Sequence, residues 1–84
     1  MLTSTTFIGT PGLWYINSPL LMGVTILNVC REGIEQNKID ATLTPGSQQF
    51  YYVSTGQLQF DPTNPFFGNI ANDVRERIFV LYDV

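Results

Sequence analysis

Phe50-Tyr51-Tyr52-Val53-Ser54-Thr55-Gly56-Gln57-Leu58-Gln59-Phe60 is the stretch that decides the fold. After Gly56, polar and apolar residues alternate strictly as far as Phe60. A half-buried strand has this period because its successive side chains point to opposite faces of the sheet. Gly56 can adopt the positive φ that a tight hairpin turn requires. The sequence therefore predicts a β-hairpin in which Tyr52 and Leu58 pair on the buried face.

Short runs rich in Val, Ile, Thr, Tyr and Phe recur along the rest of the chain, separated by turn signals at fairly even spacing. The turn signals are Pro11-Gly12, Ser18-Pro19, Glu32-Gly33, Pro45-Gly46, Thr55-Gly56 and the segment 61–68. Many short strands with frequent turns are typical of a small sandwich or barrel. The chain has 84 residues, which suits one domain. We expect a single all-β domain over residues 1–84: a small antiparallel β-sandwich, Ig-like or jelly-roll-like, of about seven short strands.

The run Arg77–Tyr82 is apolar on both parities from Ile78 to Leu81. A strand covered on both faces has this pattern, so we expect it at the centre of a sheet or in an interface.

The segment Ser18–Gln36 fits two structures. A helix would begin well, with Ser18 as its cap and Pro19 in its first turn. Gly23, Gly33 and four β-branched residues are poor choices for a helix interior. The balance favours a strand over Val24–Arg31, with the helix as the alternative.

The charge balance argues against nucleic-acid binding. Four basic residues stand against seven acidic ones, giving a net charge of −3. The basic residues are Arg31, Lys38, Arg75 and Arg77. A surface that binds nucleic acid needs a stripe of cations to neutralise phosphates, and four scattered cations do not form one.

A membrane segment and a secretory signal are not expected. The most apolar stretch, Leu20–Cys30, has 11 residues, whereas a spanning helix needs about 20. Residues 1–6 carry neither the positive charge nor the hydrophobic core of a signal peptide. We expect a chain made in a cytoplasm.

No motif points to catalysis, a cofactor or a metal. Histidine is absent, which excludes Ser-His and Cys-His nucleophile pairs. The single cysteine, Cys30, is expected to be a buried and inert thiol. Two carboxylate pairs and one set of oxygen ligands exist, but their spacing fixes neither an acid-base geometry nor a calcium loop. The pairs are Asp61 with Asp73 and Glu32 with Glu35, and the oxygen ligands are Asp61, Asn64, Asn69 and Asp73. We expect no enzyme.

Two pairs of adjacent aromatic residues, Trp14-Tyr15 and Phe66-Phe67, lie next to turn signals. In an extended chain, adjacent side chains point to opposite sides, so only one ring of each pair reaches a thin core easily. All four are candidate interface residues, with the alternative that they fill the ends of the sandwich. Charged residues make up only 13% of the chain, which suits a surface that other protein chains cover.

Four motifs stand out between Arg31 and Val84: Arg31-Glu32-Gly33-Ile34, Phe50-Tyr51-Tyr52, Gly56-Gln57-Leu58-Gln59-Phe60-Asp61-Pro62 and Glu76-Arg77-Ile78-Phe79-Val80-Leu81-Tyr82. Through them, this part of the chain resembles small β-sandwich structural proteins of tailed-bacteriophage virions, in which a Gly-x-Leu-x-Phe hairpin precedes a final strand that ends in Tyr.

The resemblance implies a non-enzymatic virion component: a capsid decoration, head fibre, neck or tail protein that binds other virion proteins or itself. It carries over no catalytic residue. Residues 1–20 lie outside it and are expected either within the domain or as an arm that reaches a neighbouring subunit. The alternative function is a small carbohydrate- or protein-binding module, with Trp14, Tyr15 or the Tyr51-Tyr52 pair as a stacking platform for sugar rings.

Overall fold

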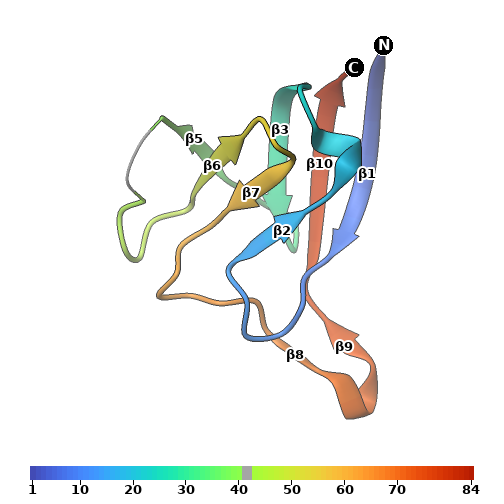
Figure 1. The fold of residues 1–84 in the computed structure, drawn as a ribbon. Helices are drawn as coiled ribbons and strands as arrows, with labels where there is room; N and C mark the ends of the chain where they lie inside the picture. The colour runs from blue at the N-terminus through green and yellow to red at the C-terminus, as the bar shows by residue number, and fades with distance from the viewer. Residues whose placement is uncertain (41–42) are drawn as a thin grey trace.

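The computed structural model describes residues 1–40 and 43–84, and its course is shown in Figure 1. It consists of strands and two single turns of 3-10 helix. The elements are β1 (Leu2–Ile8), β2 (Tyr15–Asn17), η1 (Pro19–Leu21), β3 (Thr25–Arg31), β4 (Ile34–Glu35), β5 (Asn37–Ile39), β6 (Gln49–Val53), β7 (Gln57–Gln59), β8 (Gly68–Asn69), η2 (Ile70–Asn72), β9 (Val74–Arg75) and β10 (Arg77–Asp83). None of the described helices is long and apolar enough to span a membrane.

Two four-stranded sheets form the body of the domain. The first sheet has the order β1-β10-β3-β4 and the second has the order β2-β7-β6-β5, while β8 and β9 form a separate hairpin. The expected all-β sandwich is therefore confirmed. The described strands number ten rather than about seven, because several segments pair over only two residues. One pair, β5 with β6, is parallel, which departs from the antiparallel expectation.

The predicted hairpin is present as β6 and β7. Tyr52 pairs with Leu58, as the alternation indicated, and Gly56 has a φ of 100°. The Tyr52 hydroxyl lies at the edge of the core, where it donates to the Leu21 carbonyl at 2.5 Å and accepts from the Val24 N–H at 3.1 Å. The hairpin is thus tied to the segment that connects β2 to β3.

The predicted central strand is β10, which lies between β1 and β3. Only one of its faces is buried: Ile78, Val80 and Tyr82 point inward, whereas the Phe79 side chain on the outer face is 38% exposed. The core joins both sheets in one cluster. Its buried members are Ile16, Leu21, Ile26, Val29, Phe50, Leu58, Phe60, Phe66, Ile78, Val80 and Tyr82.

The ambiguous segment contains a short helical turn and then the favoured strand. Ser18 accepts a hydrogen bond from the Leu20 N–H and caps η1. Gly23 has a φ of 65° and separates this turn from β3. The preferred strand over Val24–Arg31 is confirmed. Cys30 is only partly buried on β3, which corrects the expectation of a buried thiol.

The N-terminal residues belong to the sandwich. All seven residues of β1 pair with β10, from Leu2 opposite Asp83 to Ile8 opposite Arg77. Strand β2 pairs with β7 in the second sheet. Of the two alternatives for residues 1–20, this pairing agrees with a place within the domain and contradicts the extended arm. The run of Thr residues in β1 instead supplies β-branched side chains that suit a strand.

Candidate interaction surface

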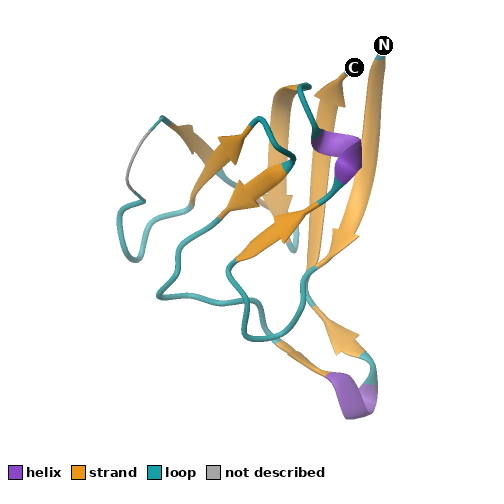
Figure 2. Cartoon of the chain, in the orientation of Figure 1, coloured by secondary structure: helices purple, strands orange, loops and turns teal. Residues whose placement is uncertain are grey.

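The hairpin formed by β8, η2 and β9 projects from one end of the sandwich, as Figure 2 shows. Its two strands are short and exposed, and Asp73 adopts a φ of 55° just before β9. Because both strands of this hairpin are exposed, they add little buried apolar surface to the core. Such a projection is suited to contact with another molecule.

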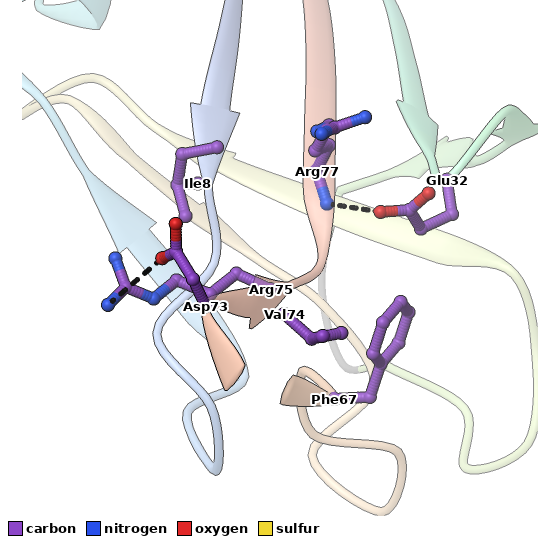
Figure 3. A pocket seen from close by; sticks show the side chains of 7 residues that line it. All are labelled: Ile8, Glu32, Phe67, Asp73, Val74, Arg75 and Arg77. Atoms are coloured by element: carbon purple, nitrogen blue, oxygen red, sulfur yellow. Dashed lines mark hydrogen bonds and ion pairs between the residues drawn. The ribbon is translucent and has the colours of Figure 1, made fainter. Parts of the chain in front are cut away.

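An open pocket of about 520 Å³ lies between this hairpin and the adjacent end of the first sheet. Figure 3 shows its side chains, which come from the ends of β1 and β10, from the β3–β4 turn and from the hairpin. The lining residues are Ile8, Glu32, Phe67, Asp73, Val74, Arg75 and Arg77. We call this the hairpin pocket. Three of its exposed side chains, Ile8, Phe67 and Val74, are apolar and gather at one pocket.

The adjacent rings of Phe66 and Phe67 point to opposite sides. Phe66 is 2% exposed and packs edge to face on Phe60, with 5.6 Å between ring centroids. It fills the end of the core, so its candidacy as an interface residue is wrong. Phe67 is 52% exposed and lines the hairpin pocket. One ring of the pair therefore anchors the loop while the other faces solvent.

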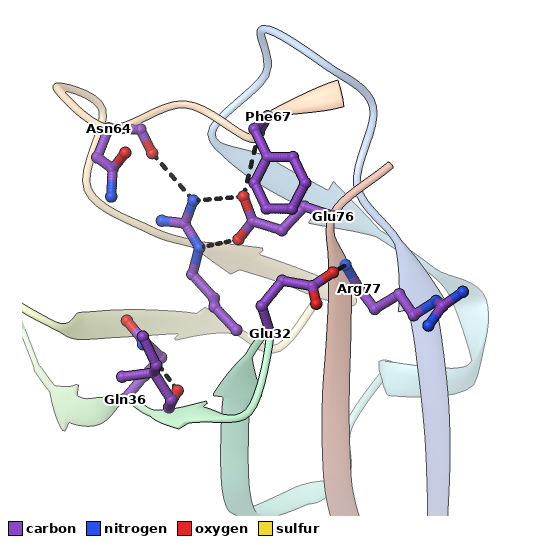
Figure 4. A network of polar contacts seen from close by, with 8 residues as sticks. Glu32, Gln36, Asn64, Phe67, Glu76 and Arg77 are labelled. Atoms are coloured by element: carbon purple, nitrogen blue, oxygen red, sulfur yellow. Dashed lines mark hydrogen bonds and ion pairs between the residues drawn. The ribbon is translucent and has the colours of Figure 1, made fainter. Parts of the chain in front are cut away.

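A buried ion pair holds Phe67 in place, as Figure 4 shows. The Arg31 guanidinium donates to both carboxylate oxygens of Glu76, at 2.5 and 3.0 Å. The same carboxylate accepts from the Phe67 N–H at 3.1 Å, and the Glu76 N–H donates to the Phe67 carbonyl at 3.1 Å. Arg31 also donates to the Asn64 carbonyl at 3.1 Å. This bidentate pair thus joins β3, the 61–67 loop and the start of β10.

Two aromatic rings flank the same guanidinium. The Arg31 Cζ atom lies 5.4 Å from the Phe60 centroid and 5.0 Å from the Phe66 centroid. Both side chains of the ion pair are less than a tenth exposed. Cation–π contacts compensate part of the desolvation of a buried guanidinium. The anchor for Phe67 is therefore rigid.

The rim of the hairpin pocket carries mixed charge. Arg75 and Asp73 form an exposed pair at 3.8 Å, which contributes little to stability. Glu32 in the β3–β4 turn accepts from the Arg77 N–H at 2.7 Å, so its carboxylate is held by backbone. The Arg77 guanidinium forms no ion pair with any described residue. Two arginines and two carboxylates line the pocket, so its formal charge is zero, although the chain as a whole carries −3.

The other aromatic pair lies at the junction of the first loop with β2. Trp14 and Tyr15 are both half-buried, and their rings meet edge to face with centroids 5.1 Å apart and planes at 75°. The Trp14 carbonyl accepts from the Phe60 N–H at 2.8 Å, which ties this loop to the end of β7. The two rings partly cover each other and present less free surface than Phe67 does.

The carboxylate pairs and oxygen ligands considered in the sequence do not form one site, because their side chains lie apart and several bind backbone groups. Asp61 is buried, and its carboxylate accepts from the Thr63 N–H and hydroxyl and from the Gly46 N–H. Asp73 is exposed on the hairpin, and Glu32 caps the start of β10. Within residues 1–40 and 43–84, no group of three His, Cys, Asp or Glu side chains could hold a metal ion.

Asp61 makes the stability of this loop depend on pH. The hydrogen bond from the Thr63 hydroxyl is the main cause that lowers the pKa of Asp61 below its ordinary 3.8, with partial opposition from burial. A carboxyl with a lowered pKa stabilises the fold above its unfolded-state pKa, and this contribution is lost as the pH falls through the folded-state pKa.

We therefore expect Asp61→Asn to lower the urea midpoint of unfolding at pH 7, because its amide cannot accept from the Gly46 N–H in the same geometry. The difference from wild type should be constant between pH 7 and 5 and should shrink below about pH 4. Comparison with the variant cancels the titration of the other carboxylates. A difference that stays unchanged down to pH 2.5 would contradict this role for Asp61.

Several residues of this surface carry no pattern in the sequence. Ile8 and Val74 belong to different strands, and only the fold brings them to one pocket. The Arg31–Glu76 pair is separated by 45 positions. One signal was available: Glu76 is a charged residue directly before an apolar strand, and Arg31 ends another apolar run.

Comparison with known proteins gives no assignment: no family model, curated protein or solved structure matches this chain.

Proposed function

We propose that this chain is a non-enzymatic structural protein of a virion, a capsid decoration, head fibre, neck or tail component, that binds another virion protein through the hairpin pocket. The observation that carries the proposal is Phe67, an exposed aromatic ring whose backbone is fixed by the buried Arg31–Glu76 pair. Rigid aromatic side chains are the typical anchors of protein interfaces, because little conformational entropy is lost when they bind.

The chemistry of the pocket defines the partner. Ile8, Phe67 and Val74 offer an apolar centre, and Arg75 and Arg77 lie at its rim. An apolar centre with a polar rim is the usual anatomy of a protein interface. Glu32 and Asp73 lie at the rim as well, so the partner segment carries an apolar anchor flanked by polar residues and charges of both signs. The resemblance of residues 31–84 to small virion β-sandwich proteins supports a partner that belongs to a virion.

The test is to express a tagged chain in cells that carry the genome encoding it and to isolate assembled particles on a density gradient. We expect the wild-type chain in the particle band and Phe67→Ala/Val74→Ala at least about tenfold depleted from it, since a central aromatic anchor contributes about 2 kcal/mol or more to binding. Both side chains are about half exposed, so the double variant should unfold at the wild-type urea concentration.

Leu20→Ala/Met22→Ala is the matched control. These two apolar residues are 55% and 59% exposed; Leu20 lies in η1 and Met22 follows it. Figure 2 shows this helical turn at the end of the sandwich away from the hairpin. This variant should enter particles as the wild type does. Absence of the wild-type chain from particles would overturn the virion assignment, and equal incorporation of both variants would overturn the role of the hairpin pocket.

The alternative, a sugar-binding module, has less support. A stacking platform needs a free ring face, whereas Trp14 and Tyr15 meet edge to face and the Tyr52 hydroxyl is engaged by Leu21 and Val24.

A further inference from the structure

Strand β1 is an open edge of the first sheet. Among the described residues 1–40 and 43–84 it has one neighbour, β10, and Figure 1 shows no ribbon beyond it on the other side. All seven of its residues are paired in one unbroken register. A seven-residue strand of this kind presents a row of unpaired N–H and C=O groups to solvent.

The alternation of hydrogen-bonded residues along β1 identifies which backbone groups are unpaired. The Gly9 N–H donates to the Glu76 carbonyl at 2.8 Å, and the Val84 N–H donates to the Met1 carbonyl at 3.0 Å. Both pairs continue the β1–β10 register, so the odd-numbered residues of β1 bond to β10. The backbone groups of Leu2, Ser4, Thr6 and Ile8 therefore point away from the sheet.

Strand β1 lacks the features that protect the other edges. It contains no charged residue, no proline and no bulge. By contrast, β4 has two residues and includes Glu35, β5 includes Lys38, and β2 has three residues. Edge strands in soluble proteins are normally short or charged because an unprotected edge pairs with other chains. An edge this long and uncharged is suited to pairing.

The sequence of β1 is complementary to itself when read in the opposite direction. With Thr5 on a twofold axis, Leu2 lies opposite the partner subunit's Ile8, and Ser4 lies opposite the partner subunit's Thr6. Each outward-facing residue then meets another outward-facing residue, giving four hydrogen-bonded pairs and about eight backbone bonds. Leu2 and Ile8 are 61% and 52% exposed in the single chain and cover each other in this arrangement.

We propose that two copies of this chain pair antiparallel through β1 and form one continuous sheet across a twofold axis at Thr5. A twofold interface of this kind is closed, so pairing stops at the dimer.

The proposal extends the proposed function, because it rests on the chain acting through protein contacts and assigns its second surface. Ile8 belongs to both surfaces, whereas Phe67 and Val74 line only the hairpin pocket and take no part in the β1 pairing. The variant Phe67→Ala/Val74→Ala should therefore lose particle binding and keep the dimer.

A cysteine at the axis tests the register. Thr5 would face the partner subunit's Thr5 as a non-hydrogen-bonded pair, with about 4.5 Å between Cα atoms, which lies within the range for a disulfide. In a Cys30→Ser background, we expect Thr5→Cys to form a covalent dimer on mild oxidation, seen on non-reducing gels. Ser4→Cys is more exposed but off the axis, and should crosslink several-fold more slowly. Faster crosslinking of Ser4→Cys would overturn this register.

Introducing like charges into β1 tests the interface without a crosslink. Ser4→Lys/Thr6→Lys places lysine opposite lysine at both central pairs and should raise the dimer dissociation constant about tenfold or more in sedimentation. Mixing it with Ser4→Glu/Thr6→Glu should restore a dimer containing one of each. Asn37→Lys/Ser54→Lys adds the same charge away from β1 and should dimerise as the wild type does. A wild-type chain that stays monomeric up to millimolar concentration, or an unaffected lysine variant, would overturn the proposal.

Discussion

Glu76→Gln should destabilise the protein by about 3 kcal/mol, a large part of the stability of a small domain. The amide keeps the size of the side chain and an oxygen for the Phe67 N–H, but it removes the charge that compensates Arg31. Both side chains of this pair are less than a tenth exposed, so water cannot replace the lost partner. Breaking one half of a buried pair leaves an unpaired buried charge. Urea unfolding at pH 7 measures the difference.

Arg31→Met/Glu76→Gln separates this explanation from general sensitivity of the site. Methionine retains an apolar stem beside Phe60 and Phe66, and neither position of the former pair carries a charge. We expect the double variant to recover at least half of the lost stability. Glu32→Ala, which changes an exposed carboxylate at the neighbouring turn, should cost no more than about 1 kcal/mol. Equal stability of the single and the double variants would show that the charge is not the cause.

The strands that the sequence predicted are those with a one-dimensional signal. Alternation identified β7 from Gln57, Leu58 and Gln59, and the β-branched run identified β3. Both signals arise because a half-buried strand places every second side chain in the core. The apolar run Ile78–Leu81 predicted a central strand correctly, but it did not predict that Phe79 lies on an open face.

The interaction surface depended on information that no local pattern contains. Phe66 and Phe67 are identical residues in adjacent positions, and the pattern predicts only that they diverge. The Gly9 backbone decides which ring enters the core, because Phe66 packs so closely on it that a Cβ there would lie 2.8 Å from the ring. The sequence left residues 1–20 open between the domain and an arm for a related reason. A Thr-rich segment shows no strong apolar alternation in the sequence, and its pairing with β10 holds it as a strand.

Gly56→Ala should destabilise the protein by about 3 kcal/mol or more, because two costs combine at this position. A φ of 100° is strained for any residue with a Cβ, at about 1–2 kcal/mol. A Cβ at Gly56 would also overlap the Ser18 carbonyl oxygen and press on Met22. The Ser18 N–H donates to the Gly56 carbonyl at 2.9 Å, so the hairpin cannot move aside without breaking the contact that positions η1.

Gly33→Ala is the matched control, because it isolates the first cost. Gly33 has a φ of 81°, but a Cβ there would meet nothing within 4 Å. Its substitution should cost about 1–2 kcal/mol in urea unfolding, the backbone strain alone. The difference between the two variants then measures how tightly the β6–β7 turn packs on the Ser18 segment. Equal losses for the two alanines would mean that this contact relaxes freely. A larger loss at Gly56 would mean that the β6–β7 turn also fixes the segment that connects the two sheets.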